Sequence, residues 1–152
     1  MKKYAPLKTA YMVSALLAVL LMALPICLHS YYYALVDGEW KLSALPDISY
    51  FNVTQFNSPL LFASYGTVMV LLLTLIWGVY PASAIKSGIL TLLTAGTAVS
   101  SIYVFRFFDR DNITVWSCFI SALLVICTIL RIWSLIKLLA DKSRSGKDYK
   151  SR

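Results

Sequence analysis

The chain has 152 residues, of which 59% are hydrophobic and only 14% are charged. Soluble domains carry about 25% charged residues, and the shortage here falls in long stretches that have none. The formal net charge is +7, but a chain this apolar leaves no broad basic face in water, which argues against nucleic acid as a partner. The composition therefore predicts one multi-pass membrane domain over residues 1–152, with the lipid bilayer as its surroundings.

Four apolar segments are long enough to cross a hydrocarbon core, which requires about 20 residues of helix. They lie at about 10–28, 60–80, 88–105 and 113–133. The first three contain no charged side chain, and the fourth contains only Arg131, near its end. Because lipid offers the backbone no hydrogen-bond partners, each segment should be a helix. The predicted fold class is an all-α membrane protein, a four-helix transmembrane bundle with a small β-prone extracytoplasmic loop.

Two further features concern these predicted helices. We interpret the first as a retained helix rather than a cleaved signal peptide, because its apolar run is long and no small-x-small site follows. Small residues recur on the third predicted helix, at Gly88, Gly96 and Ser100. Small residues let helices approach closely in lipid, either within one bundle or between copies in a homo-oligomer.

The connection at about 29–59 is the one most able to fold outside the membrane. Asp37-Gly38 is a hairpin-turn signal between two runs of β-forming residues, 31–36 and 39–45. A third such run, 48–56, follows. We therefore predict a small sheet of two or three strands.

The same connection is rich in aromatic residues, and exposed Tyr and Trp often anchor protein interfaces. Trp40, Tyr50 and Phe51 are therefore candidate partner-binding residues. The alternative is that these rings pack on one another or lie on the lipid headgroups.

In outline, four helices with a β-prone first loop resemble the claudin-like tetraspan group. That group carries a Trp, then Gly-Leu-Trp, and two cysteines in this loop, whereas this loop has Trp40 alone and no cysteine, so no family is assigned.

Basic residues predict the orientation of the chain in the membrane. Eleven of the 14 Lys and Arg residues fall on the side that holds both termini and the second connection, and the others are Lys41, Arg106 and Arg110. Since the basic side usually faces the cytoplasm, we predict cytoplasmic termini, in the plasma membrane. The fourth helix is predicted to continue past its apolar segment, because Ile132, Leu135, Ile136 and Leu139 share a helical face. Within the basic tail, about 140–152, residues 142–152 are predicted to be irregular.

Arg106 and two cysteines would lie near the outer end of the bundle. Arg106 is followed by Asp109, Arg110 and Asp111, so snorkelling or a local ion pair with an aspartate explains it, and the alternative is that it binds an anionic headgroup or partner. Cys27 and Cys118 would form a disulfide if the first and fourth helices are neighbours; the alternative is that both are free thiols.

No motif of a catalytic, cofactor-binding or metal-binding site is present in the sequence. HExxH, GxSxG and Gly-rich phosphate loops are absent, and His29 is the single histidine. The predicted helices contain no Asp, Glu, Lys or His, one of which a proton-coupled transporter normally needs at membrane depth. We therefore predict no catalytic residue, cofactor or metal.

The predicted function is a non-enzymatic accessory, scaffold or regulatory subunit of a membrane complex, with a membrane protein as partner. The alternative is a small transporter or pore-forming subunit that works as an oligomer.

Overall fold

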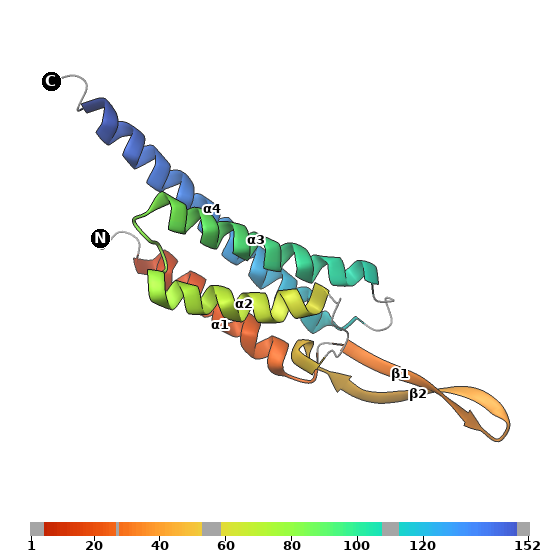
Figure 1. Ribbon diagram of the computed structural model, residues 1–152. Coiled ribbons are helices and arrows are strands. Elements are labelled where there is room, and N and C mark those ends of the chain that lie inside the picture. The colour runs from red at the N-terminus through yellow and green to blue at the C-terminus, as the bar shows by residue number, and fades with distance from the viewer. Residues whose placement is uncertain (1–4, 27, 53–58, 108–112, 149–152) are drawn as a thin grey trace.

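Four helices and a two-stranded hairpin make up the structure, a computed structural model that describes residues 5–26, 28–52, 59–107 and 113–148 (Figure 1). The helices are α1 (Ala5–Ala23), α2 (Pro59–Trp77), α3 (Ala84–Phe107) and α4 (Val115–Asp148). The strands are β1 (Leu28–Val36) and β2 (Glu39–Ile48), followed by a 3-10 turn, η2 (Tyr50–Asn52). All four helices are long and apolar enough to cross a membrane.

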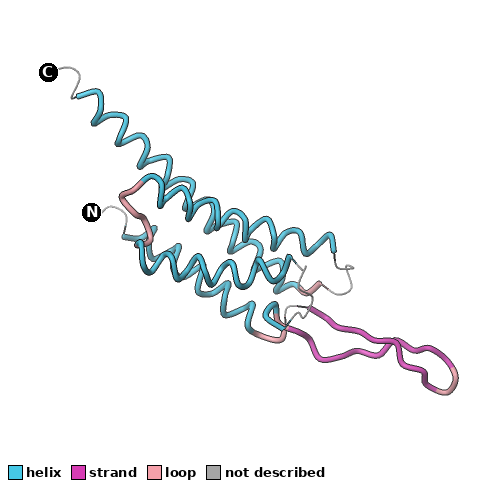
Figure 2. The backbone as a smooth tube through the Cα atoms, in the orientation of Figure 1, coloured by secondary structure: helices cyan, strands magenta, loops and turns pink. Residues whose placement is uncertain are grey.

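The helices form a bundle in which α4 packs against α1 and α3, and α3 also packs against α2. The start of α1, the α2–α3 connection and the second half of α4 lie at one end, which we call the terminal end (Figure 1). The hairpin leaves from the opposite end, the hairpin end, and projects away from the helices (Figure 2). This arrangement places the hairpin and the two chain ends on opposite sides of the bundle.

Two helix boundaries differ from the predicted ones because of single residues. The first helix ends at Ala23 rather than at 28, since Pro25 has no N–H to continue the helical hydrogen bonds. The second ends at Trp77 rather than at 80, because Gly78 adopts a left-handed φ of 83°. Glycine is the residue that most often ends a helix in this way.

The fourth helix has 34 residues and ends at Asp148, so its predicted continuation past the apolar segment is confirmed and runs further than expected. The expectation of an irregular tail is therefore wrong as far as 148. Extending an existing helix avoids the cost of forming a new first turn, so polar residues that would not form a helix alone can continue one.

The hairpin turn confirms the prediction from Asp37-Gly38. Asp37 and Gly38 both have positive φ, 56° and 81°, as the tight turns that match strand twist require. The strands pair antiparallel, with Leu35 opposite Trp40 and Val36 opposite Glu39. Among the described residues the sheet has two strands, and the predicted third run contributes η2, while its residues 53–56 lie outside the described ranges.

Side chains in the bundle are distributed in the reverse of the soluble pattern. Ile76, Ile85 and Leu92 point outward and are each 75% exposed. The interior combines small and apolar residues with buried hydroxyls, which include Ser64, Thr67, Thr74, Thr91, Thr94, Thr97, Ser101 and Ser121. Most of these hydroxyls donate to a carbonyl three or four residues back in their own helix. In a soluble bundle the polar residues would instead face outward.

Candidate functional site

Arg131 is the largest fully buried side chain among the described residues, with 1% of its surface exposed. It lies near the middle of α4, at the level where the α2–α3 connection crosses the bundle. A buried arginine inside an apolar helix is expensive and usually marks a functional or organising position. In the sequence Arg131 is only a lone charge in an apolar segment, which indicates no role by itself.

The guanidinium of Arg131 joins α4 to two other parts of the bundle by hydrogen bonds. Its Nη1 donates to the carbonyl of Val79 in the α2–α3 connection. Its Nη2 donates to Oγ1 of Thr74 on α2, at 2.6 Å. The Thr74 hydroxyl in turn donates to the carbonyl of Val70, also at 2.6 Å. A single side chain thereby fixes the end of α2 and the connection that follows it.

Two aromatic rings complete the surroundings of the guanidinium. Its Cζ atom lies 4.2 Å from the ring centroid of Tyr11 on α1 and 6.0 Å from that of Tyr80. Aromatic faces attract cations, more strongly where water is excluded. We call Arg131, Tyr11, Thr74, Val79 and Tyr80 the Arg131 cluster; it connects α1, α2, α4 and the α2–α3 connection.

No carboxylate pairs with Arg131 within the part of the chain that the structure describes. A carbonyl dipole, a hydroxyl and two ring faces meet its charge instead, and Nε is buried without a hydrogen-bond partner. Because arginine stays protonated in proteins, the cluster holds a permanent positive charge inside the bundle.

Tyr80 connects the Arg131 cluster to the first turns of α1. Its hydroxyl donates to the carbonyl of Leu7 at 3.1 Å. Burial raises the pKa of the Tyr80 phenol, an effect that the charge of Arg131 partly opposes. The phenol therefore remains protonated at neutral pH and keeps its donor for Leu7.

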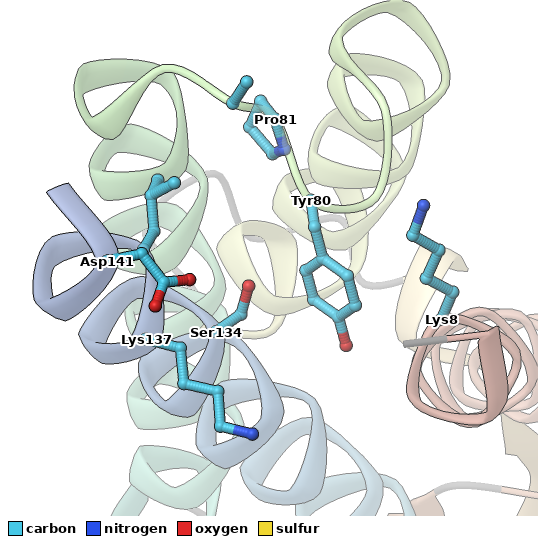
Figure 3. A pocket seen from close by; sticks show the side chains of 8 residues that line it. Lys8, Tyr80, Pro81, Ser134, Lys137 and Asp141 are labelled. Carbon is cyan, nitrogen blue, oxygen red and sulfur yellow. The ribbon is translucent and has the colours of Figure 1, made fainter. Parts of the chain in front are cut away.

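A cavity of about 190 Å³ opens beside Tyr80 at the terminal end (Figure 3). Residues of α1, the α2–α3 connection and α4 line it: Lys8, Tyr80, Pro81, Ala82, Ser134, Lys137, Leu138 and Asp141. The Nζ atom of Lys137 also lies 3.9 Å from the ring centroid of Trp133. Two lysines and one aspartate give this lining a net positive charge.

The structure does not bring the candidate partner-binding residues together. Trp40 is 70% exposed at the hairpin turn. Tyr50 is 0% exposed and packs in the core near Ala18 and Met22, so it is withdrawn as a partner-contacting residue. The chain returns to the bundle after the hairpin, and this return buries Tyr50.

Phe51 and Arg106 lie near the hairpin end. Phe51 is half-buried, and its ring meets that of Tyr65 edge to face at 5.4 Å. Arg106 is exposed in the last turn of α3. The carboxylates expected to pair with it, Asp109 and Asp111, lie outside the described ranges, so the interpretations of Arg106 stay predictions.

The predicted disulfide between Cys27 and Cys118 requires the first and fourth helices to be neighbours, and the structure confirms only this requirement. The helices α1 and α4 are neighbours, as a disulfide between Cys27 and Cys118 would require. Cys118 is an exposed free thiol in the structure, whereas Cys27 lies outside the described ranges, so the pairing stays a prediction. Cys127 is buried, and its Sγ lies 3.9 Å from the carbonyl of Tyr11.

Across the described segments, His, Cys, Asp and Glu form no group of three that could hold a metal ion.

Comparisons with known proteins give no relative from which a role could be transferred. No family model matches the chain, and neither curated proteins nor solved structures gave a match.

Thr74 provides a test of the Arg131 cluster. Replacing Thr74 with valine removes the acceptor of Nη2 while keeping a β-branched side chain, and we expect the free energy of unfolding to fall by about 1.5 kcal/mol. The measurement is an SDS titration of the full chain in mixed micelles. Thr67→Val is the matched control, because the hydroxyl of Thr67 donates to the carbonyl of Ala63 in its own helix. Equal losses for the two variants would show that Thr74 contributes nothing through Arg131.

Proposed function

We propose that this protein is an integral membrane protein whose four helices span the bilayer, and that it is an accessory or regulatory subunit of a membrane complex. The apolar outer surface supports the first part, because side chains such as Ile76, Ile85 and Leu92 would be exposed to water otherwise. The concentration of Lys and Arg at the terminal end supports cytoplasmic termini and a plasma-membrane location.

The observation that carries the subunit proposal is the hairpin that projects beyond the bundle (Figure 1). Its first strand has 9 residues, so at about 3.3 Å per residue it reaches roughly 30 Å. The headgroup layer adds only about 5–8 Å to each side of the hydrocarbon core. With the helices in the bilayer, the end of the hairpin would stand in water, clear of the headgroups.

Exposed apolar residues at the end of the hairpin suit contact with another protein. Leu35 and Trp40 are directly opposite in the register and are 60% and 70% exposed. Cross-strand partners lie on the same face of a sheet, so the two form one apolar patch, which we call the tip patch. An isolated two-stranded hairpin is marginally stable in water, and an aromatic anchor at its end is typical of an interface. The occupant we propose is the extracytoplasmic part of another membrane protein.

The test is capture of cross-linked partners from native membranes in mild detergent. We expect the double variant Leu35→Ala, Trp40→Ala to recover at least about tenfold less partner, since a buried aromatic anchor often contributes 2 kcal/mol or more. Glu39→Ala is the matched control, because Glu39 pairs with Val36 on the other face of the same turn, and it should keep full recovery.

Three outcomes would contradict this proposal. The first is unchanged partner recovery with the double variant at normal expression. The second is a ladder made only of copies of this chain. The third is solute flux through liposomes that contain this chain alone, which would favour the pore-forming alternative.

A further inference from the structure

The cavity at the terminal end lies between groups that mark the edge of a bilayer. Lys137 lies on the ring of Trp133 at 3.9 Å, and Lys86 lies on that of Trp77 at 5.7 Å. Trp77 ends α2 and Lys86 lies in the first turn of α3, and tryptophans and lysines at helix ends are the usual anchors at headgroup depth. Trp133 and Lys137 lie inside α4, but Lys137 lines the cavity together with Tyr80 and Pro81 of the α2–α3 connection, which places them at the same level. Because Lys137 also lines the cavity, the cavity belongs to this depth rather than to the hydrocarbon core.

The lining of the cavity is divided into a charged part and an apolar part. Lys8 on α1 and Lys137 on α4 approach it from different helices, with Asp141 as the opposing charge (Figure 3). Pro81, Ala82 and Leu138 supply apolar wall. Lysines beside an apolar wall suit a ligand that has an anionic group and an apolar continuation.

Two hydroxyl groups and the charge of Arg131 add to the attraction of the cavity for an anion. The hydroxyls of Ser134 and Tyr80 belong to lining residues. Arg131 lies behind the ring of Tyr80, 6.0 Å from its centroid, and its charge has no carboxylate partner among the described residues. The net charge around the cavity is therefore positive even with Asp141 included.

The size of the cavity limits what can enter. Its volume of about 190 Å³ is below the roughly 300–1,000 Å³ of pockets that enclose a drug-sized molecule. A headgroup fragment fits this space, with acyl chains left in the surrounding lipid. Basic pockets between membrane helices on the cytoplasmic side bind lipid headgroups of this kind.

We propose that this cavity binds the phosphate-bearing headgroup of an anionic phospholipid, held by Lys8 and Lys137. The proposal rests on the membrane insertion proposed above, and is independent of any partner at the hairpin. A headgroup in this place contacts Tyr80, which bonds to Leu7 and covers Arg131. Occupancy therefore stabilises the terminal end, as any ligand that binds only the folded state does.

The experiment titrates the purified full chain, in mild detergent, with short-chain phosphatidylglycerol and follows its thermal unfolding. Phosphatidylcholine of the same chain length and inorganic phosphate are the two comparison ligands. We expect only phosphatidylglycerol to raise the unfolding temperature. Lys8→Ala and Lys137→Ala should each weaken its apparent affinity about fivefold. Lys86→Ala is the matched control, since Lys86 is exposed on α3 and does not line the cavity.

Two more variants separate the cavity from general surface charge. Asp141→Asn removes the opposing carboxylate, and we expect the affinity to rise about twofold or more. Leu138→Trp fills the cavity without changing the charge, and we expect binding to be lost. The proposal is overturned if Lys86→Ala weakens binding as much as Lys8→Ala does. It is also overturned if inorganic phosphate stabilises the protein equally, or if Leu138→Trp folds and binds normally. Lys8 is exposed, so its variant keeps the test decisive even if the Trp variant does not fold.

Discussion

Replacing Arg131 with alanine is expected to lower the free energy of unfolding by about 4 kcal/mol, the largest loss we foresee for one residue. The variant leaves the part-buried carbonyl of Val79 without its donor. It removes the cation from between the rings of Tyr11 and Tyr80. It also leaves a void where the largest buried side chain had been. These losses outweigh the relief of no longer burying a charge, because two hydrogen bonds and two ring faces already compensate the guanidinium for its burial.

Two other replacements separate charge from geometry at this position. Methionine fills much of the space and carries no charge to bury, so we expect Arg131→Met to cost only about 2 kcal/mol. Lysine keeps the charge, but one ammonium cannot serve the Val79 carbonyl, the Thr74 hydroxyl and two rings together. We expect Arg131→Lys to cost about 3 kcal/mol, more than the apolar variant.

The measurement is the same SDS titration in mixed micelles, with Arg106→Ala as the matched control. Arg106 is exposed in the last turn of α3, and its loss should change stability by less than about 0.5 kcal/mol. If Arg131→Lys is as stable as the parent chain, the positive charge alone matters, and the two hydrogen bonds from the guanidinium to Val79 and Thr74 do not. If Arg131→Ala and Arg106→Ala cost the same, the cluster does not organise the bundle.

The four helices were predictable from the sequence because a long apolar stretch is a property of composition. Their ends were less predictable, because each depends on one backbone conformation. Pro81 follows the predicted end of the second helix at 80, yet the helix stops at Trp77, where Gly78 turns left-handed. A glycine after an apolar helix is a recognised end signal, and here it outweighed the proline.

The hairpin was predictable because Asp37-Gly38 determines the turn locally, within two residues. The full length of the strands was not, since the pairing runs on to Leu28 and Ile48, across a register shift between Leu28 and Ser30, beyond the predicted runs 31–36 and 39–45. Backbone hydrogen bonds between strands do not depend on side-chain type, so pairing continues while the two chains stay adjacent.

The Arg131 cluster was outside the reach of sequence patterns, because its members come from α1, α2, α4 and a connection. Its one signal was a lone charge in an apolar stretch. That charge was expected near the end of the fourth apolar segment, at 133, whereas it lies near the middle of α4, which ends at Asp148. The burial of Tyr50 was missed for a similar reason. Aromatic residues in a loop suggest exposure, and only the path of the chain shows that this one returns to the core.

Gly66→Ala is expected to destabilise the bundle by about 2 kcal/mol, through overpacking between α2 and α3. A Cβ atom at Gly66 would lie 2.9 Å from Cγ2 of Thr97. Thr97 cannot easily turn away, since β-branched side chains are stiff in helices and its hydroxyl donates to the carbonyl of Thr94 at 2.8 Å. The helices must therefore separate to admit one methyl group.

Gly88→Ala is the matched control. It tests whether the loss at Gly66 comes from the close contact with Thr97 or from replacing any small residue of these helices. A Cβ atom at Gly88 meets nothing within 4 Å, so alanine there should be neutral or slightly stabilising, as helix propensity favours it. Gly96 falls between the two, because its nearest neighbour is Cε1 of Phe62 at 3.2 Å, on a ring that is exposed and free to shift. SDS titration should therefore rank the losses as Gly66, then Gly96, then Gly88. Equal losses at Gly66 and Gly88 would mean that α2 and α3 are not in tight contact at Gly66. Both glycines lie inside helices, and only the close approach of Thr97 distinguishes Gly66 from Gly88.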